Sequence, residues 1–273
     1  FYLAEYGFSL QADIKRTVEN VQRDSESGID PAFRTMLFWI VSRGNNCTYC
    51  LGHQESGLAS RGVTEETRAA LDSDWSLFDP AQQAAFVFAK KLSFEPHQLE
   101  SHDFEQLRKH YSEKQVAELI VTIAGFNATN RWTGPMRIQQ DVLYEFSTPT
   151  AAQFANRNSL IAPSVLTSLG HSSKAVARIR PALEDWSIIR TRLAEIRDRK
   201  SLLPLADVET TERILKEKEL DPTLSTVNWV RLLSTLPKSG AERIVAYNDI
   251  KSKGTLAPRS KAVIAYVAAR HDR

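Results

Sequence analysis

The sequence contains little cysteine, little net charge and no long apolar run, and each shortage excludes a class of protein. Two cysteines among 273 residues cannot form the framework of a disulfide-rich scaffold. The longest apolar run, LIVTIAGF at 119–126, is much shorter than the ~18 residues that a membrane-spanning helix needs. The net charge is only +2, and basic residues are interleaved with acidic ones, so the sequence shows no basic segment of the kind that binds nucleic acid or an anionic membrane. We therefore predict a soluble, cytoplasmic protein without nucleic-acid or membrane partners.

Helical periodicity is what the sequence has in abundance. The apolar residues between 116 and 123 recur at i, i+3, i+4 and i+7, directly behind a capping box formed by Ser112 and Gln115. Asp79 and Pro80 likewise predict an N-cap followed by proline at the first helical position. Alternating strand patterns with hairpin turns are hard to find. The sequence therefore predicts an all-α fold.

The same signals assign most of the chain to helices. One set of apolar side chains in the first half is expected to converge on a single core: Leu37, Ile40, Val41, Phe88, Leu119 and Ile123. The further predicted helices span about 9–23, 32–43, 46–59, 64–71, 103–109, 136–145, 175–198, 208–217, 240–250 and 259–270.

A polar stretch, STPTAAQFANRNSLIAPS, divides the helical segments into two blocks. It predicts a linker at 147–164, between a helical domain at 1–146 and a second helical block at 165–273.

The second block repeats part of the first. TLAPRSKAVIAYVAARHDR aligns with GIDPAFRTMLFWIVSRGNN, so that Pro258 meets Pro31 and Tyr266 meets Trp39. Amphipathic helices also share apolar spacing by coincidence, which is the alternative. We favour a tandem duplication with an incomplete second copy.

Both cysteines lie in one short stretch, GNNCTYCLGH at 44–53. If Asn46 caps a helix that begins at Cys47, then Cys47, Cys50 and His53 fall at i, i+3 and i+6. Cys47 would then lie in the first turn, where exposed N–H groups and the helix dipole favour a thiolate. An imidazole one turn after Cys50 could accept its proton or protonate a leaving group. The stretch therefore predicts a nucleophilic thiol with a base beside it.

Several other interpretations fit a C-x-x-C pair. A zinc site would need a fourth ligand beyond Cys47, Cys50 and His53, and the sequence offers no second Cys/His pair. Covalent haem attachment requires His where Leu51 stands. A thioredoxin-like motif requires a preceding strand, whereas RTMLFWIVSR looks helical. Two buried thiols that only pack remain a further alternative. We predict neither a metal nor a cofactor.

Residues 10–140 resemble the carboxymuconolactone decarboxylase and alkylhydroperoxidase D-like (AhpD-like) family, especially its peroxidase-related branch. The resemblance is carried by IVSRGNNCTYCLGHQESGL, DPAQQAAFVFAKKLSFEPHQL and YSEKQVAELIVTIAGFNATNRW, in that order. It implies an all-α homo-oligomer whose redox-active members reduce hydroperoxides through two cysteines. Carried over, it makes Cys50 the attacking and Cys47 the resolving thiol, with an external dithiol as the reductant.

Three positions depart from the family pattern. The usual spacing is C-x-x-C-x-x-x-H, whereas His53 follows Cys50 by three residues and Gln54 occupies the expected place. Thr35 stands where the best-known peroxidase members have a proton-relay glutamate, and Tyr49 stands where they have a histidine. These departures remove or re-route the relay that the family uses.

Two glutamates are candidate replacements for that relay, namely Glu55 and Glu118, each with a solvated or helix-pairing carboxylate as the alternative. The family-like ending contains Asn127, Asn130, Arg131 and Trp132. Helix capping and packing under the site is their favoured role, and substrate contact is the alternative. The sequence therefore predicts a thiol-dependent hydroperoxide reductase. A non-redox decarboxylase-like enzyme and a non-catalytic helical scaffold are the alternatives.

Overall fold

The computed structural model describes residues 29–45, 47–72, 75–133, 185–197, 200–236 and 238–272. The regular secondary structure of these residues consists of α-helices and short 3-10 helices, without a strand. The predicted all-α class is therefore confirmed. The chain divides into two compact units, and the described residues of each are treated separately below. The predicted linker at 147–164 and the helices at 9–23 and 136–145 lie outside the described residues.

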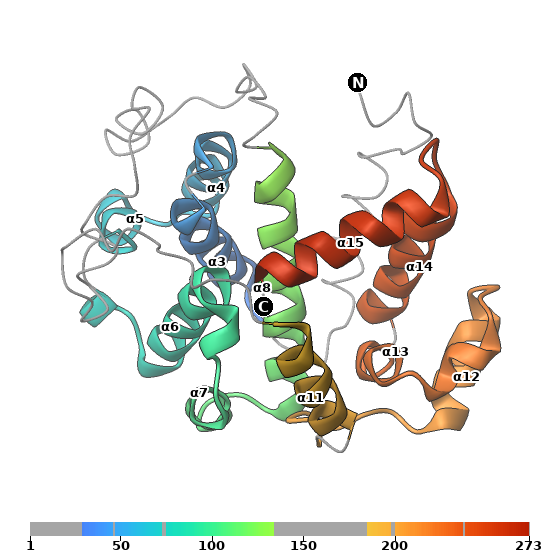
Figure 1. Ribbon diagram of the computed structural model, residues 1–273. Coiled ribbons are helices and arrows are strands. Elements are labelled where there is room, and N and C mark those ends of the chain that lie inside the picture. The colour runs from blue at the N-terminus through green and yellow to red at the C-terminus, as the bar shows by residue number, and fades with distance from the viewer. Residues whose placement is uncertain are drawn as a thin grey trace. The chain divides into compact units, whose positions relative to one another are not determined.

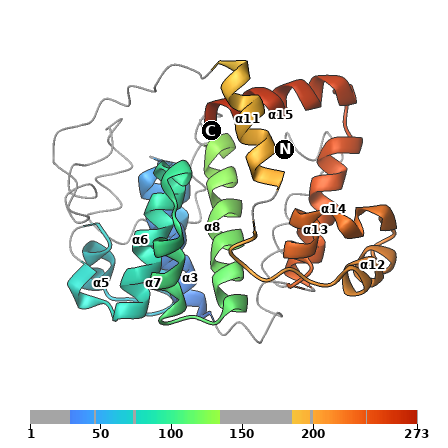
Figure 2. The same ribbon diagram turned by 60° about the horizontal axis from the view of Figure 1, so that its bottom comes forward.

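The first unit is built from six described α-helices, which Figure 1 and Figure 2 show from two sides. Helix α3 packs against α4, α6 and α8, and α8 also contacts α6. The helices are α3 (Pro31–Gly44), α4 (Thr48–Ser60), α5 (Glu65–Ala70), α6 (Pro80–Phe94), α7 (Ser101–Arg108) and α8 (Glu113–Thr133), with 3-10 turns at η1 (Trp75–Leu77) and η2 (Pro96–Gln98).

Local side-chain capping explains where these helices begin. Asp79 accepts a hydrogen bond from the Gln82 amide at 2.9 Å, and the Gln82 side chain accepts from the Asp79 amide, which completes a capping box before α6. Ser112 and Gln115 form the same reciprocal pair before α8, at 3.3 and 2.9 Å. Both predicted N-termini are therefore confirmed.

The core of this unit lies among α3, α6 and α8. The six apolar side chains predicted to converge are each exposed by 2% or less: Leu37, Ile40, Val41, Phe88, Leu119 and Ile123. Since these three helices contact one another in pairs, the expected shared core is confirmed. The core buries one face of α3, and the cysteine motif follows directly after this helix.

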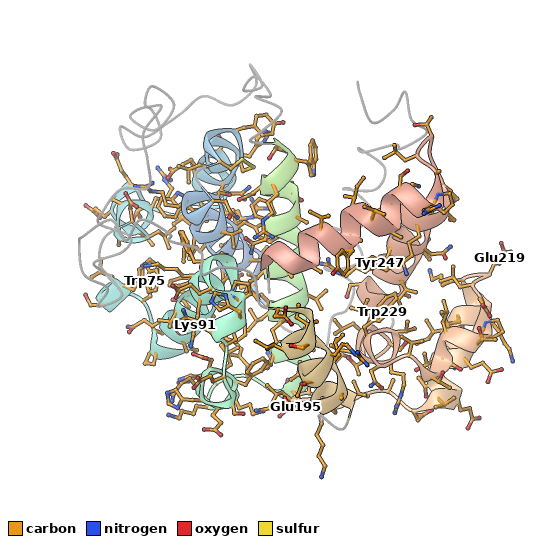
Figure 3. All side chains as sticks on the ribbon, in the orientation of Figure 1. Trp75, Lys91, Glu195, Glu219, Trp229 and Tyr247 are labelled. Carbon is orange, nitrogen blue, oxygen red and sulfur yellow. A yellow bond between two sulfur atoms is a disulfide. The ribbon has the colours of Figure 1, made fainter. Side chains whose placement is uncertain are left out.

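The second unit contains α11 (Trp186–Arg197), α12 (Val208–Glu217), η3 (Pro222–Thr226), α13 (Asn228–Leu233), α14 (Ser239–Ser252) and α15 (Pro258–Asp272). Its small core joins Leu215, Val230 and Ile244. Figure 3 shows Trp229 of α13 beside Tyr247 of α14, with ring centroids 5.0 Å apart. Helix α13 and the 3-10 turns were not predicted from the sequence.

The proposed repeat stays a prediction. Pro31 and Pro258 both open a helix, of 14 and 15 residues. The two helices differ in burial, because Trp39 is fully buried whereas Tyr266 is 55% exposed. The helix predicted at 9–23, which a comparison of the two copies also requires, lies outside the described residues.

The length and hydropathy of a helix decide whether it can cross a membrane. Within the described ranges, none of the helices combines the length and the hydropathy needed to cross a bilayer.

Candidate active site

The cysteine motif lies where α3 ends and α4 begins. Helix α4 starts at Thr48, and Cys47 is its N-cap residue, with extended backbone angles (φ −89°, ψ 92°). The Cys50 amide donates to the Cys47 sulfur at 3.3 Å, as it would to the oxygen of a serine cap. The prediction that Asn46 caps a helix beginning at Cys47 was wrong by one residue. The reason is that the Cys47 sulfur itself serves as the capping acceptor.

The sulfur atoms of Cys47 and Cys50 lie at disulfide distance, and the Cα atoms of the two residues are 5.3 Å apart. Both side chains are almost completely buried, with Cys47 exposed by 2% and Cys50 by 3%. A C-x-x-C pair that starts at a helix N-cap brings the sulfurs together without bending the helix. The pair also lies at the end of α4 where unsatisfied N–H groups favour negative charge.

A threonine at the end of α8 completes the surroundings of the pair. The Thr133 hydroxyl lies 3.0 Å from the Cys50 sulfur and 3.3 Å from the Cys47 sulfur, and it also donates to the Thr129 carbonyl at 2.9 Å. Thr133 is 2% exposed. Sequence reasoning missed this residue. Helical spacing could have indicated it, because Thr133 lies one turn after Asn130, and Asn130 was predicted to pack under the site.

A group of asparagines fixes α8 against the end of α3. The Asn45 amide donates to the Asn127 oxygen at 2.7 Å and to the Asn130 oxygen at 3.4 Å. Asn127 in turn donates to the Ser93 hydroxyl of α6 at 2.9 Å. Asn127 and Asn130 are buried, at 5% and 3% exposure. Capping and packing, the role favoured from the sequence, agrees with these contacts, which set the distance between α8 and the cysteines.

His53 lies on α4 one turn after Cys50. Its half-buried ring meets the ring of Tyr49 edge-on, with centroids 4.5 Å apart. Tyr49, one of the departures from the family pattern, thus packs against the histidine. The role of His53 as a base or acid stays a prediction.

Glu55 belongs to a buried polar network. One carboxylate oxygen accepts from the Trp39 indole at 2.7 Å, and the other lies 3.3 Å from the Arg68 guanidinium. Arg68 also donates to the Val63 carbonyl. Glu55 is fully buried, so the alternative of a solvated carboxylate was wrong. Its network links α3, α4 and the short helix α5.

Glu118 is buried as well, at 1% exposure. It pairs with Arg34 of α3 at 3.0 Å. Burial lowers the pKa of Arg34, and the attraction of Glu118 opposes that shift. Thr35, which replaces the relay glutamate of the family pattern, donates its hydroxyl to the Pro31 carbonyl at 2.8 Å, within its own helix. A proton relay through Glu118 or Glu55 stays a prediction.

A metal centre needs several ligating side chains close together. In the parts of the chain that the structure describes, there is no group of three or more His, Cys, Asp or Glu side chains that could hold a metal ion.

The chain is similar to known proteins over about half of its length. The chain is similar to the uncharacterised protein YdfG of Bacillus subtilis. The two are 22% identical over 134 residues, which cover 48% of this chain and 87% of YdfG. A crystal structure from Agrobacterium tumefaciens, of a protein of unknown function named as a candidate antioxidant defence protein AhpD, is 21% identical. That match covers 52% of this chain and 96% of the other, with a TM-score of 0.44. No family model matches the chain.

Proposed function

We propose that the chain is a thiol-dependent hydroperoxide reductase that uses Cys50 and Cys47 as a redox pair. The observation that carries the proposal is the disulfide distance between two buried sulfurs at the N-terminus of α4. The ordered set of sequence motifs that resembles the peroxidase-related branch of the AhpD-like family supports it. A C-x-x-C pair of this kind can pass between dithiol and disulfide with little change in the backbone.

The proposed cycle begins with the reduced pair. The Cys50 thiolate attacks one oxygen of the hydroperoxide, the O–O bond breaks, and the departing alkoxide takes up a proton, with His53 as the candidate donor. Cys50 is now a sulfenic acid. Cys47 attacks its sulfur, hydroxide leaves and is protonated to water, and the disulfide forms. The two thiols have then supplied the two electrons that reduce the peroxide to an alcohol.

The disulfide must be reduced before another turnover. An external dithiol is the proposed reductant, since thiol–disulfide exchange returns both cysteines to thiols and oxidises the dithiol. The burial of both cysteines favours a small hydroperoxide over a bulky one, because a large group cannot approach a sulfur that is 3% exposed without moving its surroundings.

A thiol titration tests the proposal. The protein is reduced, freed of reductant and treated with one equivalent of hydrogen peroxide, and free thiols are counted before and after. We expect both thiols to be lost and then restored by dithiothreitol. Cys50→Ser should abolish the rapid loss, whereas Cys47→Ser should leave a sulfenic acid that a dimedone probe captures. A reduced protein that keeps both thiols after peroxide would contradict the proposal and favour a decarboxylase-like enzyme or a scaffold.

If the probe is captured by Cys47 in the Cys50→Ser variant, the pair is redox-active but the two roles are exchanged. That outcome would overturn the assignment of Cys50 as the attacking thiol.

A further inference from the structure

The Thr133 hydroxyl is placed to interact with both sulfurs from outside their helix. It comes from the last residue of α8, whereas the cysteines belong to the start of α4. Its oxygen is closer to the Cys50 sulfur, at 3.0 Å, than to the Cys47 sulfur, at 3.3 Å. Thr133 is 2% exposed, so water has little access to its hydroxyl and does not readily replace its contact with the sulfurs.

The hydroxyl has one proton and two kinds of acceptor within reach. In the disulfide state, the Thr129 carbonyl at 2.9 Å is the stronger acceptor, because a disulfide sulfur is neutral. After reduction, a thiolate is an anionic acceptor, and hydrogen bonds to ionised groups are roughly twice as strong as neutral ones. Rotation about the Cβ–O bond redirects the proton from Thr129 to the sulfur without moving a heavy atom.

Cys50 needs such a donor more than Cys47 does. The Cys47 sulfur already accepts from a backbone amide at 3.3 Å, that of Cys50. Cys50 is 3% exposed, and burial disfavours its charged form. The N–H groups at the start of α4 favour a thiolate there, and the Thr133 hydroxyl adds a donor from α8 that reaches the Cys50 sulfur directly.

We propose that Thr133 is a catalytic residue that donates its hydroxyl proton in a hydrogen bond to the Cys50 thiolate and thereby sets the reactivity of the reduced pair. The assignment rests on the proposed function only in requiring that the pair exists as a dithiol. It does not depend on hydroperoxide being the substrate.

The test measures the Cys50 thiolate alone. In a Cys47→Ser background, the thiolate absorbance in the ultraviolet is followed against pH with and without Thr133→Val, which keeps the shape of the side chain and removes the hydroxyl. We expect the pKa of Cys50 to rise by about one to two units, the loss expected for one hydrogen bond to a charged group. Alkylation by iodoacetamide at a pH well below the original pKa of Cys50 should slow by roughly tenfold or more.

Two matched variants control for the fold. Thr133→Ser keeps the hydroxyl and should keep the pKa of Cys50. Thr129→Val removes a hydroxyl one turn earlier in α8, where it donates to the Gly125 carbonyl at 3.3 Å, and should also leave that pKa unchanged. Circular dichroism verifies that each variant is folded, and Thr133→Ala replaces Thr133→Val if the latter is not.

A pKa that stays the same in the hydroxyl-free variant, or that rises equally in Thr129→Val, would overturn the assignment. The titration uses no peroxide, so its failure is distinguishable from failure of the proposed reductase activity. A shifted pKa in a protein that does not react with peroxide would sustain the role of Thr133 and refute only the choice of substrate.

Discussion

Replacing Glu55 with glutamine tests whether its carboxylate serves the fold or the cysteines. Glutamine keeps an oxygen that can accept from the Trp39 indole, now at 2.7 Å, but it removes the charge that faces Arg68 at 3.3 Å. Breaking a buried ion pair by removing one partner costs about 3–5 kcal/mol. Arg68 retains its hydrogen bond to the Val63 carbonyl, so we expect the lower end, about 3 kcal/mol. Urea unfolding followed by tryptophan fluorescence measures the loss.

A matched surface pair supplies the control. Arg108 and Glu113 lie 2.6 Å apart, but their side chains are 29% and 43% exposed. Glu113→Gln should therefore cost less than about 1 kcal/mol. Equal and small losses in Glu55→Gln and Glu113→Gln would refute the argument that burial makes the Glu55 pair important. A Glu55→Gln variant that is fully stable but slow in peroxide-dependent thiol loss would instead support the relay suggested by the sequence.

Two glycines and one lysine give further tests. Gly57→Ala should stabilise the protein by about 0.5–1 kcal/mol in thermal unfolding, because the new methyl would lie 3.4 Å from the Thr35 methyl, an ordinary contact. Gly240→Ala should destabilise it by about 1–3 kcal/mol in the same assay, because its Cβ would overlap the Leu233 carbonyl. Burial lowers the pKa of Lys90 from 10.5 to about 8. The unfolded chain therefore binds more protons than the folded one between these values, and stability relative to Lys90→Met should rise across this window by up to roughly 3 kcal/mol. A flat pH dependence of that difference would contradict this reasoning.

Helix starts could be predicted from the sequence because their signals are local. The predicted N-cap at Asp79 and the predicted capping box at Ser112 use residues within three positions of one another, and both form. The same local reasoning placed the cap before α4 at Asn46, where an asparagine is the usual residue. The structure uses Cys47 instead. Cysteine is a rare cap, so ordinary preferences favoured the wrong neighbour.

Tertiary contacts explain what the sequence could not predict. Glu55 looks like a surface carboxylate on a helix until Trp39 of α3 and Arg68 of α5 meet it from either side. For Thr133 the sequence offers only its helical spacing from Asn130, which does not show that its hydroxyl meets the cysteines. Its role becomes visible only when α8 is packed, with its last turn against the start of α4. Periodicity identifies the buried face of a helix, but not which polar residue on that face meets a partner from another helix.

The Cys47–Cys50 pair lies near the end of α3, the start of α4 and Thr133 of α8, and this arrangement gives the two sulfurs different environments. Cys47 takes its hydrogen bond from the backbone of its own helix, so its donor is fixed by the existence of α4. Cys50 takes its contact from a side chain of α8, so its donor depends on how α8 is packed. The Asn45 contact to Asn127 joins the end of α3 to α8, at 2.7 Å. It therefore also holds Thr133 near Cys50. In the proposed cycle, the reactivity of Cys50 as the attacking thiol then depends on packing between helices, whereas the sulfurs reach disulfide distance within the first turn of α4.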